Sequence, residues 1–255
     1  MIPKIIHYCW LSKEKQSPFI QGCIRSWRKI MPDYQIICWD VNRFDLNLSP
    51  FAKEAYEKRK WAFAADYIRL FALYNYGGFY LDSDVRVFKR FDAFLNHGFV
   101  SSIDIQQGLE GHLDFGIQAA IMGAEVHNPF VKDCLSYYEN RHFIKEDGSL
   151  SIKPIAPDII AMYADKYGLK RINQFQLLEP NIAIYPASVF AGHPIYWTKQ
   201  SIAMHFCNNS WIPKSRIHKL TSYLYNNYRL PMLLKKIYFR LRRFYINVLQ
   251  INLIL

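Results

Sequence analysis

The sequence predicts an α/β fold that begins with parallel strands, and three features of the first 90 residues lead to that prediction. Apolar segments at 2–10 and 34–40 are typical of strands, and apolar side chains at helical spacing predict a helix at 18–32 between them. Parallel strands need such a crossover connection. A stronger helix at 61–78 ends on a Gly-Gly pair and leads directly into a further strand. With 255 residues and 51% hydrophobic content, the chain is long enough for one such domain.

The remaining expected elements continue this pattern without an internal repeat or a long linker. We expect helices at 49–60, 128–141 and 156–168, strand-like segments at 98–103, 117–123, 182–190 and 201–211, and a loop at 145–153. The change in composition near Lys214 predicts a globular domain at 1–214 and a tail at 215–255.

The net charge of +11 is unevenly distributed along the chain. No Asp or Glu follows Glu179, whereas ten Lys and Arg residues do, so the first 179 residues are nearly neutral. The five cysteines are odd in number and form no CxxC pair, and the opening MIPKIIHYCW is too short and too quickly charged for a signal peptide. These features predict reduced thiols in a cytoplasmic protein.

The tail from Pro231 has the pattern of a basic amphipathic helix. Its apolar residues fall on one side, and Lys235, Lys236, Arg240, Arg242 and Arg243 fall on the other. This pattern predicts an interfacial anchor on the inner face of the plasma membrane, because the charges prevent a membrane span. The alternatives are a terminal helix that packs on the domain and, less favoured, a nucleic-acid-binding helix without a known recognition module.

The segment GGFYLDSDVRVF at 77–88 places two carboxylates one residue apart. With the period of two of a strand, Tyr80, Asp82 and Asp84 share one face. The other face, directed into a core, carries Phe79, Leu81, Val85 and Val87. Two like charges side by side require a nearby cation, either an Arg or Lys side chain or a metal ion. On its own the D-x-D pattern is a weak signal, and a solvated strand end or a turn is the more frequent explanation.

The context of the D-x-D pair favours a metal site. Asp66 and Arg69, three residues apart, share one face of the preceding helix. These side chains and Tyr80 would gather in a cleft at the carboxyl side of the sheet, where α/β folds bind ligands. Carboxylate oxygens favour Mg²⁺ or Mn²⁺, which commonly bridge to phosphates. Such an ion neutralises the charge that develops on a diphosphate leaving group.

Three segments, IPKIIHYCW, KWAFAADYIRLFALYNYGGFYLDSDVRVFK and AMHFCNNSW, occur in the order seen in a known family. Over about residues 1–212 the chain resembles glycosyltransferase family 32, and more distantly it is similar to the glucosylating domains of large clostridial toxins. The resemblance implies the GT-A nucleotide-sugar fold, a Rossmann-like mixed sheet flanked by helices. It also implies transfer of a sugar with retention of the anomeric configuration.

The resemblance implies a role for each matching residue. Asp84 would bind Mn²⁺ or Mg²⁺ directly, and Asp82 would meet the ion through water and contact the ribose or sugar. Asp66 and Arg69 would hold the hydroxyls of the donor sugar, and Arg69 would also approach the diphosphate. The donor site would also include Tyr80 and Trp10, with Trp10 stacking on the base. His205, Asn209, Ser210 and Trp211 would complete the metal and diphosphate site.

The chain departs from the family pattern at two places, and several residues have a structural alternative. Phe206 occupies the position of a frequent second histidine, and Cys-Asn-Asn replaces a run of small residues, which weakens the assignment of the third ligand. The less favoured alternatives are that Trp10 and His205 are core residues and that Asp66 and Arg69 form a plain helix ion pair. His7 is expected to be structural, because it lies in the middle of a strand.

Gln118 is expected to face the donor sugar or the acceptor, and Asp114 is a weaker candidate nearby. No carboxylate stands out as a nucleophile, so we expect the acceptor to attack from the side of the leaving group.

The predicted function is a retaining, metal-dependent transfer from a nucleotide-sugar, with UDP favoured, to a lipid-linked or polysaccharide acceptor in bacterial capsule or O-antigen synthesis. The sugar stays open among galactose, glucose, N-acetylhexosamine and mannose. The alternatives are a toxin-like glycosyltransferase acting on a host protein and a non-catalytic membrane- or polyanion-binding protein.

Overall fold

The first half of the domain is built from strand, helix and strand units, as the sequence predicts. In the computed structural model, which describes residues 1–107 and 113–207, β1 and β2 run parallel with α1 between them. The helices are α1 (Pro18–Ile30), α2 (Pro50–Glu57), α3 (Trp61–Tyr76), α4 (Pro129–Ser136) and α5 (Ala156–Asp165). Ser17, Ser49 and Asn128 cap α1, α2 and α4 by accepting a backbone N–H with their side chains.

Most strands of the described residues form one mixed sheet with the order β2-β1-β3-β7-β5-β9-β8, and β6 pairs with the outer part of β5. These strands are β1 (Ile5–Cys9), β2 (Gln35–Trp39), β3 (Gly78–Leu81), β5 (Phe99–Gln107), β6 (Leu113–Ile117), β7 (Ile121–Ala124), β8 (Gln176–Leu178) and β9 (Ile182–Tyr185). A smaller sheet has the order β10-β11-β4, from β4 (Val85–Val87), β10 (Phe190–Ala191) and β11 (Ala203–His205). The predicted Rossmann-like mixed sheet with flanking helices is confirmed.

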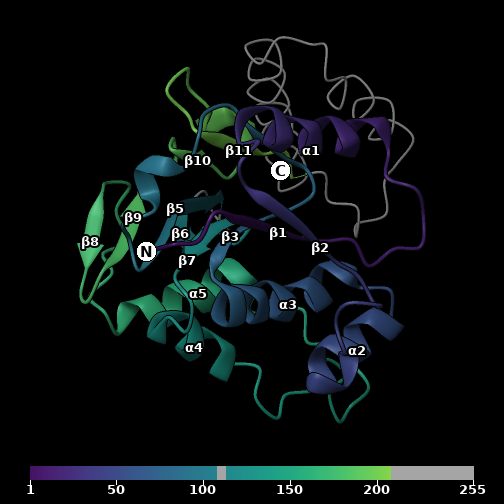
Figure 1. Cartoon of the computed structure of the whole chain (residues 1–255). Coiled ribbons are helices and arrows are strands. Elements are labelled where there is room, and N and C mark those ends of the chain that lie inside the picture. The colour runs from purple at the N-terminus through teal and green to yellow at the C-terminus, as the bar shows by residue number, and fades with distance from the viewer. Residues whose placement is uncertain (108–112, 208–255) are drawn as a thin grey trace, which may run out of the picture.

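The large sheet separates two hydrophobic cores, one on each face. Helices α3, α4 and α5 cover one face, whereas α1 lies on the other face together with β10 and β11 (Figure 1). Side chains of β1 alternate between the two faces of the sheet and so contact both cores. Ile6 and Tyr8 belong to the core around α1, and Cys9 packs against the core around α3. The fully buried Trp27 of α1 donates its indole N–H to the carbonyl of Val85, which ties the helix to β4.

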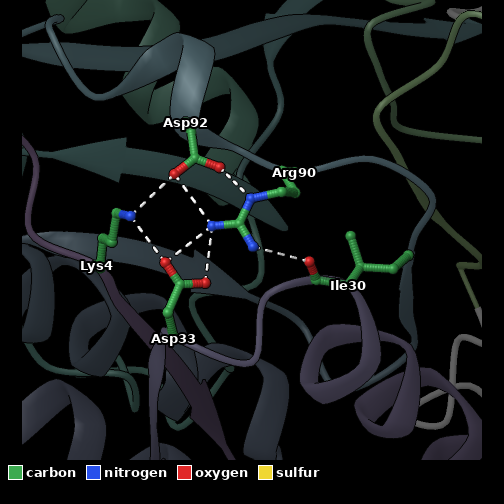
Figure 2. Close-up of polar contacts among 5 residues, drawn as sticks. All are labelled: Lys4, Ile30, Asp33, Arg90 and Asp92. Atoms are coloured by element: carbon green, nitrogen blue, oxygen red, sulfur yellow. Dashed lines mark hydrogen bonds and ion pairs between the residues drawn. The ribbon is translucent and has the colours of Figure 1, made fainter.

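A network of charged side chains joins the start of β1, the end of α1 and the segment after β4 (Figure 2). Arg90 contacts Asp33 at 2.7 Å and Asp92 at 2.5 Å, and it donates to the carbonyl of Ile30. Lys4 contacts the same two carboxylates at 2.8 and 3.2 Å. Hydrogen bonds from Lys4 and Arg90 lower the pKa of Asp33 to about 2. Because one guanidinium and one ammonium share two carboxylates, this network fixes where the chain enters β1.

Some of the predicted elements differ from the structure. The expected strand at 117–123 is broken at 118–120, so it forms the end of β6 and the separate strand β7. The helix expected at 128–141 ends at Ser136, and β8 was not predicted. The tail and the boundary at Lys214 lie outside the described residues. Within those residues, no helix combines the length and the apolar character that crossing a membrane requires.

Candidate active site

The D-x-D pair lies in a turn rather than in a continuous strand. β3 ends at Leu81, Asp82–Asp84 turn, and the chain enters the smaller sheet at Val85. The N–H of Asp82 donates to the carbonyl of Ala120 at 2.9 Å, and the N–H of Val85 donates to the carbonyl of Asp82 at 2.9 Å. The prediction of one extended strand was therefore wrong, because the chain changes sheets at this point. The prediction that Phe79, Leu81, Val85 and Val87 share one core is confirmed.

Arg69 is a buried cation beside this turn. Its Nη2 lies 2.9 Å from Oδ1 of Asp66 and 3.5 Å from Oδ1 of Asp82. Its Nη1 donates to the carbonyl of Ala119 at 2.8 Å, and its guanidinium lies 4.9 Å from the ring centroid of Tyr80. Only 5% of Arg69 is exposed. The guanidinium is thus held between the helix and the turn by groups from three segments.

Burial raises the pKa of Asp66 to about 7, with a further contribution from the charge of Asp82, and the charge of Arg69 opposes this rise. Tyr80 donates its hydroxyl to Oδ1 of Asp82 at 2.9 Å, so the two side chains lie on one side as the alternation predicts. Burial also raises the pKa of Tyr80, which therefore remains a hydrogen-bond donor at neutral pH. Carboxyl groups with a shifted pKa at a cleft are typical of functional sites.

His205 approaches the D-x-D turn from the neighbouring strand. β11 pairs antiparallel with β4, with His205 opposite Val85. Its Nε2 lies 3.1 Å from Oδ1 of Asp84 and 3.7 Å from Oδ2 of Asp82. One ligand atom from each of the three side chains lies within 4.8 Å of the others. Two carboxylates and an imidazole are suitable ligands for Mn²⁺ or Mg²⁺, so this donor set fits the divalent ion that the sequence predicts.

Cys207 lies on the other side of the imidazole and was not predicted from the sequence. Its Sγ is 3.4 Å from Nδ1 of His205 and donates to the carbonyl of Gly192 at 2.9 Å. Burial would lower the pKa of His205, but Cys207 and Asp84 raise it well above the usual range. The thiol thus contacts the Nδ1 side of the imidazole, whereas the Nε2 side faces the two aspartates.

Comparison with known families identifies the segment that holds four of these side chains. Residues 18–100 match the family described as "Glycosyltransferase sugar-binding region containing DXD motif". This segment is similar to the DXD-containing sugar-binding region of glycosyltransferases. Asp66, Arg69, Asp82 and Asp84 lie within the matched residues, and the resemblance to DXD-containing glycosyltransferases is therefore confirmed.

The curated relatives that match this region include proteins named for mannosyl transfer. Inositol phosphoceramide mannosyltransferase 3 of Schizosaccharomyces pombe is 33% identical over 100 residues, which are 38% of this chain and 28% of that protein. Mannosyl phosphorylinositol ceramide synthase CSH1 of Saccharomyces cerevisiae is 27% identical over 154 residues, 56% of this chain and 38% of that protein. The chain therefore spans less than half the length of either relative.

Two glycosyltransferases are among the solved structures that align with part of this chain. The PaToxG glycosyltransferase has a TM-score of 0.49 at 18% identity, over 65% of this chain and 69% of that chain. The galactosyltransferase LgtC has a TM-score of 0.41 at 12% identity, over 89% of this chain and 97% of that chain.

Trp10 directly precedes a loop whose residues line a cavity. It directly follows β1, its N–H donates to the carbonyl of Trp39, and its indole N–H donates to the carbonyl of Glu14 at 3.0 Å. The half-buried ring is thereby fixed beside the loop that follows β1. A cavity of about 370 Å³ adjoins this loop and is lined by Leu11, Ser12, Lys13, Glu14, Tyr56, Glu57, Arg59 and Trp61.

The remaining candidates separate into buried, exposed and undescribed residues. Gln118 is 3% exposed and lies in the break between β6 and β7, whereas Asp114 is exposed on β6. Phe206 is a core residue, packed edge-on against Phe19. His7 is buried, as a structural histidine should be. Asn209, Ser210 and Trp211 lie outside the described residues.

Proposed function

We propose that the chain is a metal-dependent, retaining glycosyltransferase that takes its sugar from a nucleotide-sugar. The observation that carries this proposal is the convergence of Asp82, Asp84 and His205 on one point at the carboxyl side of β3, beside the buried Arg69 and Asp66. A bound Mn²⁺ or Mg²⁺ would neutralise the charge that develops on the diphosphate leaving group.

The arrangement of the described residues supports this proposal. Arg69 is fixed by Asp66, Asp82 and the carbonyl of Ala119, so its orientation is set before a ligand binds. Preorganised charges of this kind stabilise developing charge without having to reorient during the reaction. Arg69 and Asp66 would bind the sugar hydroxyls, and Arg69 would also face the diphosphate. The base would lie at Trp10 and the adjoining cavity of about 370 Å³.

The relatives narrow the choice of donor and acceptor to be tested first. Their names specify mannosyl transfer to inositol phosphoceramide, which makes mannose the first sugar and an inositol-containing glycolipid the first acceptor to test. The sequence favours UDP as the nucleotide, so UDP- and GDP-sugars belong in the same screen. The bacterial capsule or O-antigen setting has no support among these relatives, and polysaccharide acceptors come second.

The tail at 215–255 is proposed to bind the catalytic domain to a membrane surface. A lipid-linked acceptor lies in the plane of a bilayer, and the basic amphipathic pattern would hold the catalytic domain on the inner face of that bilayer. This localisation rests on the sequence pattern and on the names of the relatives.

The first experiment measures release of nucleoside diphosphate from UDP- and GDP-sugars with Mn²⁺. We expect release from one donor, lost with a chelator and lowered roughly 100-fold or more in Asp84→Asn. Glu146→Gln is the matched control, because it removes an exposed carboxylate in the loop between α4 and α5. A folded wild-type chain that neither releases the diphosphate nor binds nucleotide in a metal-dependent way would contradict the proposed function.

A further inference from the structure

The sulfur of Cys207 makes two contacts, and each uses a different side of the thiol. Sγ donates to the carbonyl of Gly192 at 2.9 Å, and it lies 3.4 Å from Nδ1 of His205. Because the single S–H proton is directed at the carbonyl, the sulfur meets the imidazole as a hydrogen-bond acceptor. Nδ1 of His205 therefore carries a proton in this contact, and its N–H donates to Sγ.

The proton on Nδ1 determines what the other ring nitrogen can do. A neutral imidazole with its proton on Nδ1 has a lone pair on Nε2, and a metal ion binds through that lone pair. Nε2 of His205 lies 3.1 Å from Oδ1 of Asp84 and 3.7 Å from Oδ2 of Asp82. A proton on Nε2 leaves when this nitrogen binds an ion, whereas the proton on Nδ1 keeps its contact with Sγ. Cys207 thus supports the ring orientation that a divalent ion between these side chains would require.

The carbonyl that accepts the thiol belongs to a closely packed segment. Gly192 directly follows β10, which pairs in parallel with β11, with Ala191 opposite Met204. A Cβ at Gly192 would lie 2.5 Å from Oδ1 of Asp104, which is shorter than a real Cβ contact allows. The acceptor of the S–H proton is therefore held beside β11 by the backbone of its neighbouring strand.

The backbone also places Cys207 directly beside the metal-ligand candidates. The preceding Phe206 is buried in the core, and its N–H donates to the carbonyl of Asp84 at 3.3 Å. Cys207 has a φ of 49°, which is uncommon for a residue other than glycine. Such conformations persist where the surrounding structure requires them, and they are frequent at functional sites. The position of the thiol is therefore fixed by the fold on both sides of the imidazole contact.

We propose that Cys207 is a positioning residue that orients His205 for binding a divalent metal ion. It would act on the ion only through the imidazole, because Sγ faces Nδ1 and the ion would lie at Nε2. Metal-binding histidines commonly have a partner on the second ring nitrogen, and the loss of that partner weakens metal binding about 10- to 100-fold. This inference rests on the proposed function, since that function makes His205 a metal ligand.

The test compares the affinity for Mn²⁺ among variants of the full chain, measured from the EPR signal of the free ion. Cys207→Ala keeps the Cβ, and with it the backbone constraint at this φ, but removes the acceptor for Nδ1. We expect it to bind Mn²⁺ about tenfold more weakly than wild type. Cys207→Ser should retain most of the affinity, because a hydroxyl can accept from Nδ1 while it donates to Gly192.

A double-mutant cycle separates positioning of His205 from a general structural role. In a His205→Ala background, Cys207→Ala should cause no further loss of Mn²⁺ affinity, because the imidazole through which the thiol acts is gone. Cys38→Ala is the matched control, because it removes another half-buried thiol, in β2, and should leave the affinity unchanged. If Cys207→Ala does not fold, Cys207→Gly takes its place, since glycine readily adopts a positive φ.

The outcomes for Cys207 and for the proposed function are distinct. A wild-type chain that binds Mn²⁺, with no loss in Cys207→Ala or with an equal loss when His205 is absent, would overturn the positioning role and leave the proposed function in place. A folded wild-type chain that neither binds Mn²⁺ nor releases nucleoside diphosphate would overturn the proposed function and the positioning role with it.

Discussion

His7 is a buried histidine in β1, and both of its ring nitrogens have partners. Its Nε2 is 2.7 Å from the carbonyl of Gly77, so this nitrogen must carry a proton and donate. Its Nδ1 accepts the indole N–H of Trp39 at 3.1 Å. A second proton on Nδ1 would face this N–H, and the imidazole is therefore neutral in the folded protein. Burial lowers the pKa of His7 to about 4.

The pKa of His7 predicts how stability changes with pH. Its ordinary value is 6.5, so in weak acid the unfolded chain binds a proton that the folded chain excludes. This contribution to stability is fully present above about pH 6.5 and is lost as the pH falls towards 4. We expect the free energy of unfolding, measured with urea, to fall by about 2 kcal/mol between pH 8 and pH 5 from this residue.

His7→Gln should be less stable at pH 8, because the exchange disturbs two buried hydrogen bonds, but it should lack this decrease between pH 8 and 5. His127→Asn is the control, because His127 is exposed and its φ of 56° is tolerated by asparagine. A decrease of the same size in His7→Gln as in wild type would rule out His7 as its source.

At the scale of single residues, the sequence predicted the site side chains that local patterns bring together. Asp66 and Arg69 share a helix face, and Asp82 with Asp84 flanks one residue, so their proximity follows from short-range geometry. Cys207 was not predicted. It reaches the site through its contacts with the carbonyl of Gly192 and with His205. A single sequence does not encode such long-range contacts in a local pattern.

At the scale of elements, the junction between α3 and β3 depends on two glycines. Gly77 has a φ of 63° with a ψ of −162°, a conformation that is essentially limited to glycine. Gly78 has a φ of 91°, and a Cβ there would lie 2.7 Å from the carbonyl oxygen of Ile5 in β1. The pair thus reverses the chain and brings β3 against β1, which sets the position of the D-x-D turn.

This packing predicts different costs for the same substitution at two glycines. Gly78→Ala should lower the free energy of unfolding by about 3 kcal/mol, from backbone strain and the clash with Ile5. Gly168→Ala is the matched control, because its φ is 87° but nothing lies within 4 Å of a Cβ there. It should cost only about 1 kcal/mol. Equal costs in urea denaturation would show that contact with β1 adds nothing.

The helices that were predicted well are those whose ends carry capping residues or glycines in the sequence. The helix that begins at Trp61 precedes the Gly-Gly pair, and capping residues precede α1, α2 and α4, so their starts were predicted well. The break at 118–120 was missed because 117–123 is almost uninterrupted apolar sequence. There the backbone groups of 118–120 form hydrogen bonds with Ser102, Arg69 and Asp82 instead of pairing with a neighbouring strand. Those partners are far away in the sequence.

At the scale of the whole molecule, the net positive charge is concentrated in the residues after Glu179, and the preceding residues are nearly neutral. The described domain neutralises much of its charge internally, as the network of Lys4, Asp33, Arg90 and Asp92 illustrates (Figure 2). The residues after Glu179 contain ten Lys and Arg and no acidic residue. A polyvalent basic segment of this kind is attracted to the anionic inner leaflet of a membrane over about one Debye length, roughly 10 Å at 0.1 M salt.

We therefore predict that the full chain sediments with vesicles that contain anionic phospholipid and not with neutral vesicles, and that high salt releases it. Replacing Lys235, Lys236 and Arg240 with Gln should weaken binding about 100-fold, since each basic residue near the surface contributes about 1 kcal/mol. Replacing the exposed Lys132, Lys145 and Lys170 of the domain is the matched control and should leave binding unchanged. Equal sedimentation with neutral vesicles, or an equal loss in both triple variants, would contradict an electrostatic anchor in the tail. A selective loss would explain how a soluble donor and a lipid-linked acceptor meet at one catalytic domain.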